Sequence, residues 1–199
     1  MVVLQHHEQR FLLSLARQAI HQYCLAGSTL TVEEALANFG RGHRLSSQFR
    51  TTLHTNTGVF VTLLKKGQLR GCIGYIEPLL SLGEAIIENA INAAFHDPRF
   101  APVSQDELSV ITIELSLLSV PQPLSYQSPK ELLSKLDTTM GLIVRRGNRR
   151  ATFLPQVWEQ LPTKEAFLSH LCIKAGLVAD AWMNEPLQFS FYTVIHFSE

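Results

Sequence analysis

The sequence lacks the features by which several common classes of protein are recognised. It has no net charge, because 17 Lys and Arg residues balance 17 Asp and Glu residues, so the chain as a whole has no field that would hold a nucleic acid or an anionic membrane. It has no apolar run near the ~18 residues of a membrane-spanning helix, and no basic N-terminal region followed by an apolar core and a cleavage site. These absences predict a globular protein with no targeting segment.

Cysteine is scarce, and its placement argues against a disulfide framework. The three cysteines, Cys24, Cys72 and Cys172, lie far apart, form no CxxC pair and cannot all pair within one chain, which predicts a reduced, cytoplasmic setting. None of the eight histidines stands at a familiar ligand spacing from Cys, Asp or Glu, so the sequence predicts no metal site. Phosphate-loop, GxGxxG, HExxH and GxSxG motifs are absent, which excludes the common enzyme templates and leaves the cofactor, if there is one, unknown.

Hydrophobic periodicity predicts an α+β fold with antiparallel strand pairing. Apolar residues at helical spacing, with capping residues at the ends, predict helices over 8–26, 31–39, 82–96, 129–136 and 163–175. Alternating or β-branched runs predict strands over 59–64, 69–74, 110–118, 140–146, 149–154 and 187–197. The polar stretch 40–57 is interpreted as an irregular connection or mobile arm. Two hairpins and the absence of strict βαβ alternation favour α+β over α/β.

The stretch Leu69–Gly74, with the sequence LRGCIG, carries a charge, a thiol and two glycines inside a run typical of a strand. In an extended segment, Arg70, Cys72 and Gly74 share one face, while Gly71 and Ile73 lie on the other. Glycine weakens a strand, so this pair indicates either a bulge in the strand or a close approach to the backbone by a ligand or by a neighbouring helix.

Cys72 has two interpretations. As a nucleophile it requires its thiolate form, which Arg70 on the same face would favour. His54 and His96 are possible bases for it, and Glu114 a possible orienting group, although the sequence does not show that they meet. As a structural residue, Cys72 is a small buried hydrophobe.

Three further polar residues could each bind either a ligand or another group of the protein. Arg99, in the loop Asp97-Pro98-Arg99, suits a carboxylate or phosphate ligand, but it could equally pair with Asp97 and tie the loop to the sheet. Asn89, within a helix, could bond to strand backbone or to a ligand. Glu114 interrupts an apolar strand and is a possible general base or metal ligand if it faces a cleft.

The hairpin 145–150 carries four arginines, Arg145, Arg146, Arg149 and Arg150. They could grip phosphate groups, or they could form a solvated hairpin tip. The zero net charge and the lack of interleaved aromatic residues favour the solvated tip over nucleic-acid binding.

An ordered set of segments from residue 58 to the C-terminus resembles the AMMECR domain family, whose bacterial members are called AmmeMemoRadiSam system protein A. The segments are Gly58–Leu63, Leu69–Gly74, Glu88–Ala90, Ala93–Phe95, Asp97–Phe100, Glu114, Thr152–Val157, Lys174–Leu177 and Trp182. The resemblance implies an antiparallel sheet flanked by helices, a smaller second lobe, and a cleft between them near LRGCIG. It divides the chain into an N-terminal helical segment and irregular arm, 1–57, and an AMMECR-like domain, 58–199, within a single compact unit.

The resemblance also implies partners, because family members are encoded beside, or fused to, a Memo-like protein and a radical S-adenosylmethionine protein. We therefore expect a small-molecule-binding protein or a component of such a pathway. A non-catalytic adaptor is the main alternative, and nucleotide or RNA binding is a third hypothesis. The candidate catalytic residues are Cys72 and Glu114, and the candidate substrate-binding residues are Arg70, Gly71, Ile73, Gly74, Asn89, Asp97 and Arg99.

Overall fold

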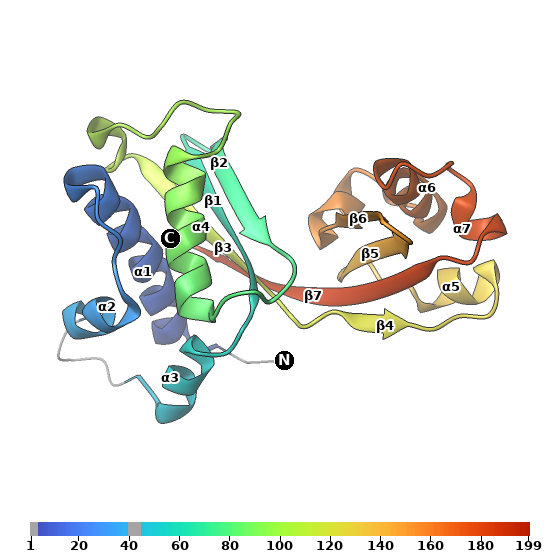
Figure 1. Ribbon diagram of the computed structural model, residues 1–199, viewed down its shortest axis with the longest axis horizontal. Helices are drawn as coiled ribbons and strands as arrows, with labels where there is room; N and C mark the ends of the chain where they lie inside the picture. Colours follow the sequence, from blue (N-terminus) through green and yellow to red (C-terminus); the bar gives the residue numbers. More distant parts are fainter. Residues whose placement is uncertain (1–3, 40–44) are drawn as a thin grey trace. The chain divides into compact units, whose positions relative to one another are not determined.

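The computed structural model describes residues 4–39 and 45–199, and the chain divides into two compact units (Figure 1). Unit 1 contains the chain up to Leu118 together with Ile195–Glu199, and unit 2 is Ser119–Val194. The N-terminal helices therefore belong to the same unit as the strands that follow residue 57. Within the two described ranges, no helix is both long enough and apolar enough to cross a bilayer.

Unit 1 is built from helices packed on an antiparallel sheet. Its elements are α1 (His6–Ala26), α2 (Val32–Asn38), α3 (Ser47–Leu53), β1 (Gly58–Lys65), β2 (Gln68–Tyr75), α4 (Leu82–Phe95), the 3-10 helix η1 (Gln105–Glu107) and β3 (Ile111–Leu118). The strand order is β2-β1-β3, followed by the C-terminal end of β7 (Gln188–Ser198). The backbone N–H of Glu199 donates to the carbonyl of Ile113 at 3.2 Å, which holds the end of the chain beside β3.

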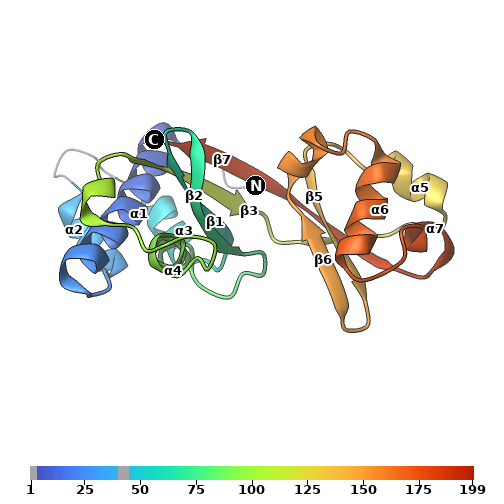
Figure 2. The ribbon, with the colours of Figure 1, turned by 90° about the horizontal axis from the view of Figure 1, so that it is seen from above.

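Helices α1 and α4 cover one face of this sheet, where they lie on the same side of β1 to β3 in both views (Figures 1 and 2). Alternate residues of β1, namely Val59, Val61 and Leu63, are fully buried against them, as the period of two requires. The intervening side chains of Phe60 and Thr62 point to the opposite face and are only partly buried. One face of the unit 1 sheet is thus core, and the other carries polar groups.

Helix α3 lies inside the stretch 40–57, for which the sequence predicts an irregular connection, and that prediction is wrong for residues 47–53. The Ser46 hydroxyl caps the helix by accepting from the N–H of Phe49 at 3.1 Å, and Phe49 and Leu53, four residues apart, are buried in the unit 1 core. Two apolar positions are too few to give a recognisable helical period. The part of the predicted arm at 40–44 lies outside the described residues.

Unit 2 has its own core and its own set of strands, which pair with β7 or with one another. Its elements are β4 (Gln122–Leu124), α5 (Pro129–Lys135), β5 (Met140–Arg146), β6 (Arg149–Phe153), the 3-10 helix η2 (Pro155–Glu159), α6 (Lys164–Lys174), α7 (Ala181–Asn184) and most of β7. Strands β4 and β5 flank β7, and β6 pairs with β5, all antiparallel. In the core, Trp158 stacks on Phe167 with ring centroids 3.7 Å apart. The predicted α+β class with antiparallel pairing is confirmed.

Candidate functional site

The LRGCIG stretch forms most of β2, the strand at the edge of the unit 1 sheet. Thr62 of β1 stands opposite Cys72 on one side and opposite Glu114 of β3 on the other. Since directly opposed residues share a face, Cys72, Thr62 and Glu114 lie in a row across the sheet face that α1 and α4 leave uncovered.

Both glycines of the stretch lie where a larger side chain would collide with the protein itself. A Cβ atom on Gly71 would overlap the backbone carbonyl oxygen of Ala93 in α4, and one on Gly74 would overlap the ring of Phe60 and the carbonyl of Val59. Of the two explanations for a close approach to this strand, the neighbouring helix is the one observed at Gly71. Ile73, on the same face as Gly71, packs against the unit 1 core.

The pair Asp97 and Arg99 holds the backbone of Cys72. The Cys72 N–H donates to Asp97 Oδ2 at 2.9 Å, and Arg99 Nη2 donates to the Cys72 carbonyl oxygen at 3.0 Å. Because β2 is an edge strand, these two backbone groups point away from the sheet and have no strand to pair with. The carboxylate and the guanidinium supply the acceptor and the donor that a further strand would have supplied.

Hydrogen bonds keep this pair ionised. Arg99 donates from Nε to Asp97 Oδ1 at 2.9 Å and from Nη2 to Oδ2 at 2.6 Å. These bonds, opposed by burial and helped by the Cys72 N–H, hold the pKa of Asp97 well below its usual range. The Asp97 side chain is 2% exposed, whereas that of Arg99 is 52% exposed, so the outer part of the guanidinium faces solvent.

Arg70 is committed to a second internal ion pair. It donates from Nε to Glu107 Oε1 at 3.0 Å and from Nη2 to Oε2 at 2.9 Å, and Lys65 Nζ donates to the same carboxylate at 2.8 Å. The bonds from Arg70 and then from Lys65 hold the pKa of Glu107 well below its usual range. Since its side chain is only 13% exposed, Arg70 ties β2 to η1 and offers little surface to a ligand.

The thiol of Cys72 is half-buried, and Thr62 Oγ1 donates to its sulfur at 3.2 Å. Within residues 4–39 and 45–199, no imidazole or carboxylate lies within hydrogen-bonding distance of this sulfur. Neither of the histidines considered as bases meets it: His96 contacts the Tyr23 hydroxyl at 3.4 Å, and His54 lines a separate cavity of about 550 Å³ in unit 1. The geometry is therefore that of a half-buried thiol with no base beside it among the described residues.

Glu114 lies on the same face with a partner that the sequence did not single out. His196 Nε2 is 4.0 Å from Glu114 Oε2, and its Nδ1 is 3.3 Å from Ser116 Oγ. Two strand spacings, about 10 Å, separate the positions of Cys72 and Glu114. His196 reaches this face only because the end of β7 lies beside β3, and no sequence motif links these two segments.

The remaining candidates have mainly internal partners. Asn89, fully buried in α4, donates from Nδ2 to the Val59 carbonyl at 3.3 Å, and its Oδ1 has no partner among the described residues. In unit 2, Arg146 pairs with Glu185, and Arg149 donates to the carbonyl of Gly176, so the arginine hairpin is partly tied down. Across the described ranges, no group of three or more His, Cys, Asp or Glu side chains is placed to hold a metal ion.

Comparison with known proteins identifies the family. The AMMECR1 family matches residues 13–197. A protein of Methanothermobacter thermautotrophicus is 42% identical over 187 residues, spanning 91% of this chain and 88% of that protein, and protein MK0488 of Methanopyrus kandleri is 39% identical over 201 residues, spanning 96% and 88%. The crystal structure of the uncharacterized protein PH0010 from Pyrococcus horikoshii aligns with a TM-score of 0.79 at 33% identity, covering 98% of this chain and 93% of that one. The chain belongs to the AMMECR1 family.

Proposed function

We propose that this protein binds a small anionic molecule on the open face of the unit 1 sheet, at Cys72 and Arg99. One observation carries the proposal: the Cys72 backbone is held at both its N–H and its carbonyl, while Cys72 is only half-buried and the Arg99 side chain is 52% exposed. A binding group fixed by rigid neighbours loses little entropy when a ligand arrives.

The charge on Arg99 supports an anion as the ligand. The hydrogen bonds from Arg99 to Asp97 raise the pKa of Arg99, so the guanidinium stays charged. An arginine with N–H groups open to solvent suits a carboxylate or phosphate. Arg70, which the sequence suggested for the same task, is also ion-paired, but its side chain is only 13% exposed, against 52% for Arg99.

The row across the sheet extends the proposed site. A ligand about 10 Å long that contacts Cys72 and Thr62 would reach Glu114 two strands away, and His196 of the next strand, β7, lies 4.0 Å from the Glu114 carboxylate. Glu114 is therefore proposed as a contact, or as a proton acceptor at the far end of the ligand. The family resemblance supports placing this binding step in a pathway with a Memo-like protein and a radical S-adenosylmethionine protein.

The alternative function, a non-catalytic adaptor, is favoured by a different observation. Gly71 contacts α4, Arg70 pairs with Glu107 and Asp97 pairs with Arg99, so much of the LRGCIG environment is explained by internal packing. In that case β2 serves as a rigid joint, and its thiol has no chemical role.

Alkylation with iodoacetamide separates the two functions. Cysteine peptides of the native protein are quantified by mass spectrometry over time, and the unfolded protein gives the intrinsic rates. We expect Cys72 to react far faster than Cys172, which is fully buried and whose pKa is raised by burial. Cys24, half-buried on α1, is the matched control. Equal and negligible labelling of Cys72 and Cys172 would remove the thiol from the site and favour the adaptor.

Protection from alkylation tests for the anion. Millimolar inorganic phosphate or citrate should slow the labelling of Cys72, while sodium chloride at the same ionic strength should not. The labelling of Cys24 should not change with any of these salts. A reactive Cys72 that phosphate and citrate leave unprotected would contradict anion binding while keeping the thiol accessible.

A further inference from the structure

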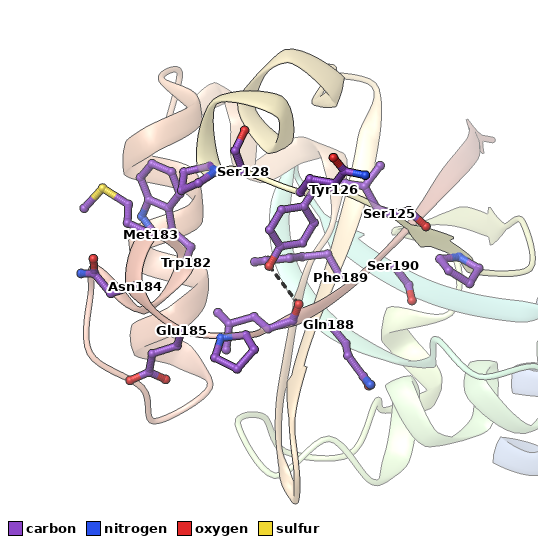
Figure 3. A pocket seen from close by; sticks show the side chains of 16 residues that line it. Ser125, Tyr126, Ser128, Trp182, Met183, Asn184, Glu185, Gln188, Phe189 and Ser190 are labelled. Carbon is purple, nitrogen blue, oxygen red and sulfur yellow. Dashed lines mark hydrogen bonds between the residues drawn. The ribbon is translucent and has the colours of Figure 1, made fainter.

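Unit 2 contains an open cavity of about 850 Å³ that none of the sequence motifs indicated (Figure 3). Its walls are the segment 123–129, which runs from β4 to the start of α5, and the segment 182–190, which runs from α7 into β7. Strands β4 and β7 pair only from Gln122 to Leu124, and beyond that point the two segments separate. All the lining residues belong to unit 2.

The floor of the cavity is aromatic and apolar. Trp182, Leu187 and Phe189 are at least nine-tenths buried, and Tyr126 packs against Phe189 with ring centroids 5.8 Å apart. The polar tips of the floor are already bonded, since the Tyr126 hydroxyl donates to the Leu187 carbonyl at 2.9 Å, drawn as the dashed line in Figure 3, and Trp182 Nε1 donates to Ser169 Oγ at 3.1 Å. A ligand would meet the floor through apolar contact.

The rim supplies neutral hydrogen-bonding groups. The side chains of Ser125, Gln127, Gln188 and Ser190 line the cavity and make no hydrogen bond with any residue in the described ranges. Two are hydroxyls and two are amides, and each can both donate and accept. These four side chains can therefore replace their hydrogen bonds to water with hydrogen bonds to the hydroxyl groups of a ligand.

The cavity has no unpaired charge to offer. Glu185 is the only lining residue with a charged side chain, and it is paired with Arg146 of β5. A phosphate or carboxylate bound here would have to leave water without a cation to replace it, which is unfavourable. The lining therefore selects against anionic ligands.

We propose that this cavity is a second binding site, separate in chemistry from the Cys72 face, for an uncharged ring compound that carries several hydroxyl groups. The apolar side of such a ring packs on the partly exposed ring of Tyr126, which Phe189 supports from within the core, and its hydroxyls bond to the four free rim side chains. Saccharides and nucleosides share this chemistry, and the binding experiment distinguishes them.

The experiment is an NMR titration of the ¹⁵N-labelled full chain. Cellobiose and maltose form one arm, adenosine and uridine the second, and glucose 6-phosphate and adenosine monophosphate the charged controls. Binding should shift the indole resonance of Trp182 and the side-chain amide resonances of Gln127 and Gln188, while the indole of Trp158, which does not line the cavity, should stay unchanged. Charged counterparts should bind more weakly than the neutral compounds.

Matched glutamine variants locate the contact. Gln127→Ala and Gln188→Ala should each weaken binding by about tenfold at most, the effect expected of one lost hydrogen bond. Gln122→Ala is the control, because Gln122 is exposed on β4 but does not line the cavity. Binding of only the saccharides or only the nucleosides would show to which of these two classes the ligand belongs. Failure of both neutral arms, equal binding of the charged compounds, or equal loss in Gln122→Ala would each overturn the proposal.

Discussion

Replacing Asp97 with alanine should destabilise unit 1 by an amount that the geometry sets. The partly buried Cys72 N–H would lose its acceptor, which costs about 1–3 kcal/mol. Arg99 would lose its carboxylate, but water can replace much of that bond because its side chain is 52% exposed, so its share is at most about 1 kcal/mol. Together these contributions predict a loss of about 1–4 kcal/mol in the free energy of unfolding.

Two measurements check this prediction. Urea unfolding followed by circular dichroism gives the loss of stability, and hydrogen exchange followed by mass spectrometry should show faster exchange in peptides that contain β2. Asp106→Ala is the matched control, since Asp106 is exposed in η1 and has no hydrogen bond to another described residue. If both variants lie within about 0.5 kcal/mol of the wild type, Asp97 does not hold the strand edge.

The effect should depend on pH with a definite sign. The folded pKa of Asp97 lies below the ordinary value of 3.8, so its contribution to stability is complete above that value and is lost as the pH falls toward the folded pKa. The stability difference between the wild type and Asp97→Asn should therefore be largest near neutral pH and shrink below about pH 4. A difference that grows on acidification would refute the assigned ionic state.

Two further substitutions test the surroundings of β2. Gly71→Ala should destabilise the protein by about 1–3 kcal/mol in urea unfolding, because the added methyl group overlaps the Ala93 backbone, whereas Leu69→Ala on the exposed part of the same strand should change stability by less than about 0.5 kcal/mol. The wild type should lose stability as the pH falls below the ordinary glutamate value of 4.5, because the pKa of Glu107 is lowered in the folded state. Glu107→Gln should lack this contribution to the pH dependence of stability. The exposed Glu159→Gln should have the same pH profile as the wild type.

The candidate site shows which structural features a local sequence pattern can predict and which it cannot. Period-two alternation correctly separated Cys72 from Gly71 on β2, because side-chain direction in a strand depends only on neighbouring residues. It could not show that Arg70 pairs with Glu107, since those residues are 37 positions apart and meet only when η1 folds against the strand. Arg70 is close to Cys72 in the sequence, but in the structure Arg70 is paired with Glu107 and is not a free cation beside the thiol.

The same limit explains the missed elements. Long helices such as α1 and α4 repeat their apolar positions often enough to be recognised, whereas α3 has only Phe49 and Leu53 to bury. The cavity in unit 2 has no motif at all. Its lining comes from two segments more than fifty residues apart, and neither of them alone predicts a cavity.

The sequence by itself determined the fold class, the strand that carries Cys72 and the resemblance to the AMMECR1 family, because periodicity, capping and motif order are properties of neighbouring residues. Only the tertiary structure decided which arginine stays accessible, which histidine joins Glu114 and where a ligand-sized cavity opens. These outcomes depend on contacts between distant segments, and the free energy of such contacts belongs to the folded chain as a whole.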